Sequence, residues 1–120
     1  MAVSQILKCM VGIDGEEHIY VMLIPGDKVL KIKRVRQLTN GIRIDLADRD
    51  VISKTLGLTV GALSPIQLIG KAKRYFMDNH VFREERVAMS SGDPNSGILL
   101  NPHGLAETLQ ATTCDIVSVR

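Results

Sequence analysis

Two apolar runs near the start of the chain constrain its fold more than any other feature. Residues 6–13 and 19–24 are rich in isoleucine, leucine, valine and methionine, and Asp14-Gly15 stands between them. Such runs favour strands, and an Asp-Gly dipeptide tolerates the positive φ angles of a tight turn. We therefore expect two adjacent antiparallel strands. Pro25-Gly26-Asp27 should end the second one, because proline lacks an amide donor and glycine accepts turn geometry.

The rest of the chain predicts further short strands and short helices. Apolar or alternating stretches predict strands at residues 42–46, 73–77, 86–89, 98–100 and 115–119. Helices are expected over the basic segment 28–38, over 48–56 with Gly57 as the stop, and over 102–110 after the start signal Asn101-Pro102. The expected class is α+β, with a mixed, largely antiparallel sheet and short helices, in a single domain spanning residues 1–120.

Composition excludes several classes of protein. The 120 residues are 45% hydrophobic and 23% charged, which excludes a disordered tail or a collagen-like repeat. Aromatic residues make up 3%, too few for the stacking surface of a single-strand nucleic-acid binder. The longest apolar run, residues 19–25, is far short of the roughly 20 residues that span a bilayer, so no membrane segment is expected. Two cysteines and no signal-peptide pattern indicate a reducing, cytoplasmic setting.

Familiar catalytic and metal-binding motifs are missing from the sequence. The three histidines stand in separate polar contexts without metal-ligand spacing, and neither a Gly-x-Ser-x-Gly elbow nor a P-loop occurs. We therefore expect no metal and no cofactor. Cys9 follows Lys8 within a predicted strand, and we interpret it as a small buried thiol rather than as a nucleophile.

A set of segments in a fixed order carries more information than any of these motifs. They are Lys8 in the first strand, Pro25-Gly26-Asp27, the loop 56–65 with its Gly-x-x-x-Pro motif, Tyr75-Phe76-Met77-Asp78, Ser90-Ser91-Gly92-Asp93 and residues 100–105. Over roughly residues 5–116 the chain resembles the YbaK/aminoacyl-tRNA editing family. That family includes the editing domain inserted in bacterial prolyl-tRNA synthetases and its free-standing relatives.

The chain departs from the pattern of this family at two places. Cys9 stands where relatives usually carry threonine after the lysine. Relatives also carry a helical segment before the lysine strand, whereas seven residues precede Lys8 here. We expect a YbaK-like fold shortened at its N-terminus, with part of the pocket wall absent or supplied by a partner.

The resemblance implies hydrolysis of the ester that links a wrong, small amino acid to tRNA, typically a proline-specific tRNA. It implies that Lys8 is catalytic, fixing the adenylate end of the tRNA or holding the ester region. The sequence offers no obvious protein base, and the family commonly relies on the 2′-hydroxyl of the terminal ribose. Substrate binding is expected from the two remaining motifs, which comprise Gly61, Ala62, Leu63, Ser64 and Pro65, and Ser90, Ser91, Gly92 and Asp93.

Local sequence leaves ordinary alternatives open for each of these features. Lys8 could protect a strand edge from aggregation, and the two motifs could be a tight turn and a hairpin loop. The cations Lys31, Lys33, Arg34 and Arg36 could contact tRNA phosphates or form a solvated helix face.

Two functions of different class remain open from the sequence. The first is a hydrolase that edits misacylated tRNA, with prolyl-tRNA synthetase as a candidate partner. The second is a non-catalytic module that binds charged tRNA ends, amino acid derivatives or a synthetase. We also expect a homodimer, because a shortened domain exposes an apolar wall or a sheet edge that a second copy can cover.

Overall fold

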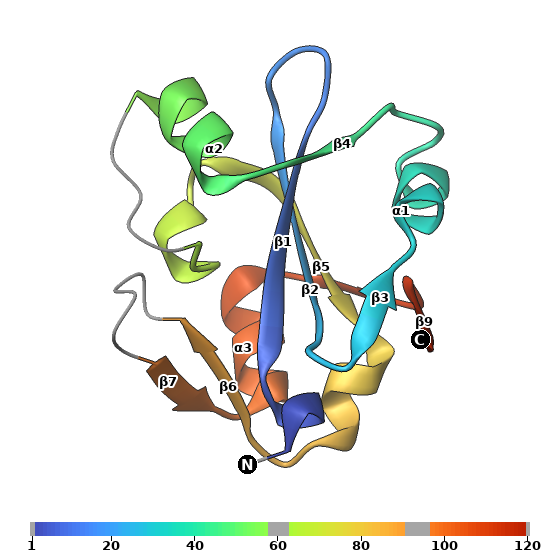
Figure 1. Ribbon diagram of the computed structural model, residues 1–120, viewed down its shortest axis with the longest axis vertical. Helices are drawn as coiled ribbons and strands as arrows, with labels where there is room; N and C mark the ends of the chain where they lie inside the picture. The colour runs from blue at the N-terminus through green and yellow to red at the C-terminus, as the bar shows by residue number, and fades with distance from the viewer. Residues whose placement is uncertain (1, 58–62, 91–96, 120) are drawn as a thin grey trace.

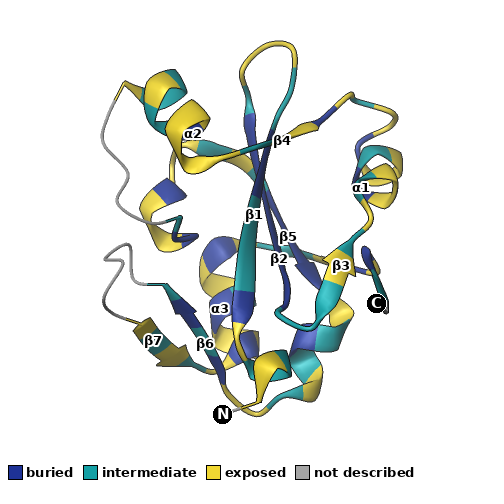
Figure 2. Cartoon of the chain, in the orientation of Figure 1, coloured by how far each residue is buried: buried dark blue, intermediate teal, exposed yellow. Residues whose placement is uncertain are grey.

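The predicted hairpin is the framework of the fold. The computed structural model describes residues 2–57, 63–90 and 97–119. β1 (Leu7–Ile13) and β2 (Ile19–Pro25) pair antiparallel over their whole length, which confirms the prediction. All seven residues of β2 are buried. The second strand of the hairpin therefore lies at the centre of the protein (Figure 1, Figure 2).

The turn of this hairpin depends on a carboxylate rather than on a glycine. The positive φ angle, 64°, belongs to Glu17, and Gly15 does not adopt one. Asp14 accepts hydrogen bonds from the His18 amide at 2.9 Å and from the Tyr20 hydroxyl at 2.8 Å. Burial tends to raise the pKa of Asp14, but these hydrogen bonds outweigh it and lower the pKa to about 2. Asp14 therefore ties the turn to the second strand.

A five-stranded mixed sheet is built on the hairpin. Its order is β4-β1-β2-β5-β8, where β4 is Asp45–Ala47, β5 is Ala72–Asp78 and β8 is Thr112–Cys114. β1 lies between β2 and β4, antiparallel to both. β5 runs parallel to β2, and β8 runs parallel to β5. The α+β class and the mixed sheet are thus as expected.

Different elements cover the two faces of this sheet, and each face carries its own apolar cluster. One face packs against α2 (Arg49–Leu56), η2 (Ile66–Leu68), η3 (Asn79–Arg83), β6 (Val87–Ser90), β7 (Gly97–Leu100) and α3 (Pro102–Leu109). The other packs against α1 (Ile32–Leu38), β3 (Lys28–Leu30) and β9 (Val117–Val119). A short turn, η1 (Val3–Gln5), precedes β1 (Figure 1). No helix in the described part of the chain is long and apolar enough to cross a bilayer.

Capping residues define the two helices that the sequence predicted best. Asp48 accepts the amide of Val51 at 2.9 Å and begins α2, which ends at Gly57 with a φ of 69°. Asn101 accepts the amide of His103 at 2.9 Å and begins α3. These caps satisfy amides at the helix starts that have no partner within the helix.

Three predicted elements were wrong in their bounds. The basic helix starts only at Ile32, because residues 28–30 form β3 and pair with β9. The strand expected at 42–46 is shorter and begins later, as β4, and Leu46 is 50% exposed although alternation predicted it to be buried. The strand expected at 115–119 is β9 alone, preceded by the separate β8. The bounds of all three elements are set by strand pairing, which local sequence patterns do not reveal.

Candidate functional site

One edge of β1 is only partly covered, and the candidate site lies there. β4 pairs with this strand at residues 11–13, and a single parallel bridge joins Ile6 to Ala88 of β6. Between these contacts, no strand of the described residues pairs with residues 7–10 of β1 on this edge. This gap between two strands leaves backbone and side chains of β1 accessible to a ligand.

A hollow of about 430 Å³ lies at this gap. Most of its lining is apolar, and the only charged side chain among the lining residues is the exposed Asp48. The lining residues are Cys9, Met10, Val11, Leu46, Ala47, Asp48 and Leu63. Because Cys9 and Met10 are successive residues of one strand, they point to opposite faces of the sheet, and the hollow straddles the sheet edge.

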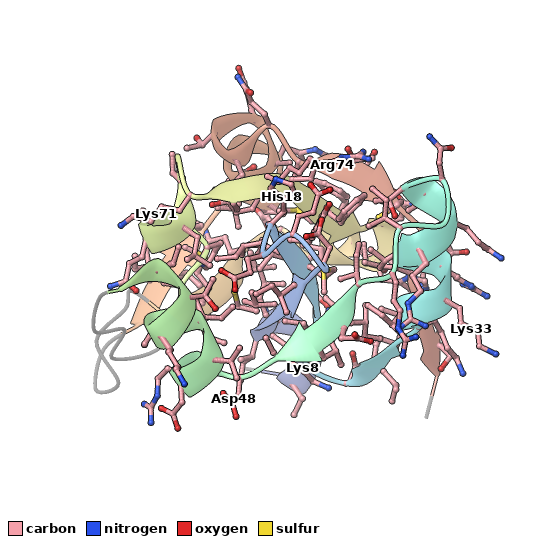
Figure 3. All side chains as sticks on the ribbon, turned by 90° about the horizontal axis from the view of Figure 1, so that it is seen from above. Lys8, His18, Lys33, Asp48, Lys71 and Arg74 are labelled. Carbon is pink, nitrogen blue, oxygen red and sulfur yellow. The ribbon has the colours of Figure 1, made fainter. Side chains whose placement is uncertain are left out.

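Lys8 lies beside this hollow, and its side chain points to the α1 face of the sheet. It is half-buried, and its Nζ donates to the backbone oxygen of Lys28 at 2.7 Å. The ammonium forms no ion pair with a carboxylate among the described residues. In Figure 3 Lys8 and Asp48 are seen on the same side of the molecule. Within the described part of the chain, Lys8 is therefore a cation held by one neutral acceptor, the backbone oxygen of Lys28.

Cys9 faces the opposite side of the sheet and lines the hollow. It is half-buried, and its environment raises the pKa of the thiol to about 12. The cause is desolvation, which disfavours the thiolate. At neutral pH Cys9 is therefore a neutral thiol and a poor nucleophile, as the sequence indicated.

The Gly-x-x-x-Pro motif meets the hollow through Leu63. The backbone oxygen of Pro65 accepts the Tyr75 hydroxyl at 2.7 Å, which fastens the end of this loop to β5. Ser64 is completely buried, and its hydroxyl has no hydrogen-bond partner among the described residues. Gly61 and Ala62 lie outside the described residues, so their expected role stays a prediction.

The second substrate-binding motif is described only at its first residue. Ser90 ends β6, the strand whose Ala88 bridges to Ile6 of β1. Because the bridge is parallel, the two strands run in the same direction from it. Lys8 follows Ile6 by two residues on β1, and Ser90 follows Ala88 by two residues on β6, so β6 runs toward the stretch of β1 that carries the lysine. Ser91, Gly92 and Asp93 lie outside the described residues.

The four cations of the basic cluster differ in their surroundings. The Arg34 guanidinium lies 3.1 Å from Asp115, and that of Arg36 donates to the backbone oxygen of Ile44 at 2.9 Å. Lys31 and Lys33 are exposed, and their side chains have no partner among the described residues. The structure thus separates two arginines that hold α1 in place from two lysines that face solvent.

Two polar features escaped sequence reasoning. Asp48 was recognised only as the start of a helix, and its position in the hollow depends on the pairing of β4 with β1. Asp78, His80 and Asp115 also come together, with one ligand atom of each within 4.8 Å of the others. Asp78 already accepts the amides of His80 and Ile116, both at 2.8 Å, so this cluster acts as a structural cap for η3.

Comparisons with known proteins identify the family and the fold. The sequence profile of the aminoacyl-tRNA editing domain matches residues 1–108. Solved structures share the fold. A crystal structure of the hypothetical protein APE2540 superposes with a TM-score of 0.85 at 25% identity, covering 98% of this chain and 77% of that one. A protein described as a candidate trans-editing enzyme for prolyl-tRNA synthetase superposes with a TM-score of 0.80 at 19% identity, covering 98% of this chain and 73% of that one.

Proposed function

The chain belongs to the aminoacyl-tRNA editing domain family, and on that premise we propose that it hydrolyses the ester bond of tRNA carrying a wrong, small amino acid. The observation that carries this proposal is the hollow at the open edge of β1, with Lys8 beside it. A strand edge offers backbone donors and acceptors to a ligand, and the hollow offers it an apolar wall. The proposed reaction consumes water and needs no metal or cofactor.

The lining of the hollow suits the aminoacyl part of such a substrate. Its apolar side chains fit a small side chain, and Asp48 provides a negative charge for the α-ammonium group of the ester. Asp48 accepts the Val51 amide through Oδ1, and a carboxylate has further lone pairs for a second donor. We assign Asp48 the recognition of the amino group.

Lys8 supplies the positive charge that the reaction needs. Ester hydrolysis places negative charge on the carbonyl oxygen, and a preorganised donor stabilises it. The Lys8 ammonium has three donors, of which the backbone oxygen of Lys28 takes one. The flexible stem lets Lys8 exchange that acceptor for the ester carbonyl or for the phosphate of the terminal adenosine.

The proton of the attacking water is assigned to the substrate rather than to the protein. Cys9 is unsuited as a base because its thiol is protonated, with a pKa near 12. Asp48 is engaged as a helix cap and as the proposed partner of the amino group. The 2′-hydroxyl of the terminal ribose then orients the water, and the protein acts mainly by positioning.

Contact with tRNA outside the hollow is assigned to α1. Lys31 and Lys33 are exposed and unpaired among the described residues, so they can approach phosphates at little cost. Arg34 and Arg36, also expected to touch phosphate, would first have to leave Asp115 and Asp45. We therefore propose the two lysines as the main phosphate contacts on this helix.

The partners follow from the same reasoning. We propose a proline-specific tRNA as substrate and prolyl-tRNA synthetase as an associated enzyme, supported by the description of one structural neighbour. A cytoplasmic location accords with that substrate.

Self-association is proposed through two exposed apolar side chains. Leu46 of the edge strand β4 is 50% exposed, and Val51 of α2 is 43% exposed. A concentration-independent monomer mass in sedimentation from micromolar upward would argue against the dimer.

Release of amino acid from charged tRNA under multiple turnover tests the proposed function. Esters of alanine, cysteine, serine, threonine and proline on the same tRNA should be hydrolysed at different rates. The ester that is hydrolysed fastest identifies the preferred amino acid. Small side chains differ by contacts worth only about 1 to 3 kcal/mol, so a graded series is expected. Binding of charged tRNA without any turnover would instead support the non-catalytic binding module.

A further inference from the structure

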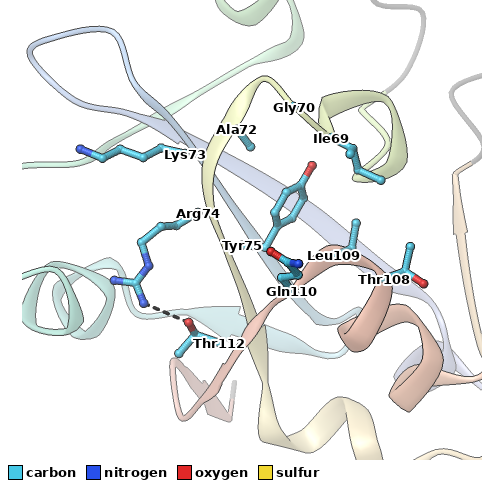
Figure 4. Close-up of a pocket in the computed structure, with 10 residues that line it drawn as sticks. All are labelled: Ile69, Gly70, Ala72, Lys73, Arg74, Tyr75, Thr108, Leu109, Gln110 and Thr112. Atoms are coloured by element: carbon cyan, nitrogen blue, oxygen red, sulfur yellow. Dashed lines mark hydrogen bonds between the residues drawn. The ribbon is translucent and has the colours of Figure 1, made fainter.

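A second pocket, of about 360 Å³, lies between the start of β5 and the end of α3 (Figure 4). β8 pairs with β5 only at residues 76–78, so residues 72–75 have no strand partner on that side among the described residues. β2 separates β5 from β1 in the sheet, so this pocket is distinct from the hollow at the β1 edge.

A β-bulge places two cations side by side at this pocket. Ile19 of β2 pairs with Ala72, but the next residue, Tyr20, pairs with Arg74, which leaves Lys73 as the extra residue. A bulge interrupts the normal alternation of side chains. Lys73 and Arg74 consequently extend to the same side of β5 (Figure 4). The register shift thus concentrates positive charge at one place.

Arg74 is held in position without a carboxylate partner. Its Nη2 donates to the hydroxyl of Thr112 at 2.9 Å, its Nη1 donates to the backbone oxygen of Leu38 at 3.5 Å, and its guanidinium lies 4.6 Å from the centre of the Phe76 ring. The residue is half-buried and forms no ion pair with any described residue. A guanidinium fixed in this way keeps donors and charge available to an anion, with little loss of side-chain entropy on binding.

The lining of this pocket distinguishes it from the other hollows. The β1-edge hollow contains Asp48, a hollow beside the hairpin turn contains Asp14 and Glu16, and a hollow near β3 contains Asp27 and Glu84. The β5–α3 pocket has two cations and no carboxylate in its lining, although one of the cations, Lys73, also lines the hollow beside the hairpin turn. Its remaining polar groups are neutral donors and acceptors, supplied by Thr108, Gln110, Thr112 and Tyr75.

We infer that the β5–α3 pocket binds a phosphate group, with Arg74 as its main ligand, Lys73 as a supporting ligand and Thr112 as the residue that holds Arg74 in place. Guanidinium matches phosphate by two parallel hydrogen bonds, and hydroxyls complete such sites. This inference goes beyond the proposed ester hydrolysis. The phosphate can belong to the backbone of a bound tRNA or to a free phosphorylated molecule, and the two sources are separable.

Titration of the protein with inorganic phosphate tests the site, followed by amide chemical shifts and by the unfolding temperature. Wild type should show saturable binding. Arg74→Gln should weaken it by about tenfold or more, since a charge-assisted contact is lost. Lys73→Gln and Thr112→Val, which removes the hydroxyl that holds Arg74, should weaken it less, and Lys54→Gln, which removes an exposed cation from α2, should leave it unchanged.

Lys73, which is exposed, and Thr112, which contacts Arg74, decide the outcome even if Arg74→Gln fails to fold. Weaker phosphate binding in both variants supports the site. No saturable binding by wild type, or equal binding by all folded variants, overturns it. None of these titrations involves an ester, so a wild type that binds phosphate but releases no amino acid would contradict only the proposed function.

The salt dependence of tRNA affinity then identifies the source of the phosphate. If it belongs to RNA, Lys73→Gln should reduce the slope of log affinity against log salt by about one unit. If the slope is unchanged while adenosine monophosphate competes with inorganic phosphate, the natural ligand is a free phosphorylated molecule.

Discussion

The hollow at the β1 edge and the pocket at the β5 edge lie on one sheet but have opposite character. The first is lined mainly by apolar side chains and has one carboxylate, Asp48. The second is lined by Lys73, Arg74 and neutral polar groups. An apolar hollow can select a small side chain, but it supplies few groups for chemistry. A cationic pocket can hold charge without a group that reacts. Recognition of the aminoacyl group and attraction of phosphate should therefore be separable by mutation.

The largest expected effect is at Lys8, the cation beside the apolar hollow. Lys8→Ala should lower single-turnover hydrolysis by about 10² to 10³, the range for loss of a preorganised donor. Lys8→Met keeps the aliphatic stem and should lose as much, because the charge is what matters. The lost hydrogen bond to Lys28 should cost about 1 kcal/mol of unfolding free energy.

Thermal unfolding of the Lys8 variants separates catalysis from stability. A folded Lys8→Ala protein with near wild-type hydrolysis would remove the catalytic assignment. Failure of both variants to fold would make the lysine a structural residue. Either result would leave the β1-edge hollow without a positive group that serves the reaction.

A smaller effect is expected at Asp48, the charged side chain of the apolar hollow. Asp48→Asn should slow hydrolysis of ordinary aminoacyl esters by about tenfold, the cost of one lost charge-assisted contact. Esters with an acetylated amino group should be hydrolysed equally by both proteins. Asparagine is as good a helix cap as aspartate, so α2 should persist. Equal losses on both esters would refute recognition of the amino group.

The lysines of α1 should change affinity rather than turnover. Replacing Lys31 and Lys33 with glutamine should reduce the salt slope of tRNA binding by about two units, one for each lost phosphate contact. Lys54→Gln is the matched control on another helix. Arg36→Gln should instead lower stability, because its guanidinium bonds the backbone of Ile44. An unchanged slope in the double variant would make these lysines a solvated helix face.

The smallest effect is expected at Cys9, which lines the hollow but has no proposed chemical role. With a thiol pKa of about 12, the thiolate is scarce throughout the working pH range. Cys9→Ala should therefore keep near wild-type hydrolysis, and the pH–rate profiles of the two proteins should coincide between pH 6 and 9, roughly two or more units away from any thiol titration. An alkaline limb present only in wild type would assign Cys9 a catalytic role.

Elements defined by local chemistry were predictable from the sequence. The β1–β2 hairpin follows from two apolar runs, and α2 and α3 follow from the caps Asp48 and Asn101. The extents of β3, β4 and β9 were not predictable, because each depends on a partner distant in sequence. Leu46 illustrates the reason, since its alternation fits a buried position but its place on the edge strand exposes it.

The candidate site likewise has features that the sequence predicted and features that depend on tertiary contacts. By itself, the sequence determined the class of fold, the order of family-like segments and the identity of Lys8, because these depend on residue type and spacing along the chain. Only the tertiary structure decided that Asp48 lines the same hollow as Cys9 and that a bulge turns Lys73 toward the side of Arg74. These juxtapositions come from strand pairing and register, which are set by contacts between residues far apart in sequence.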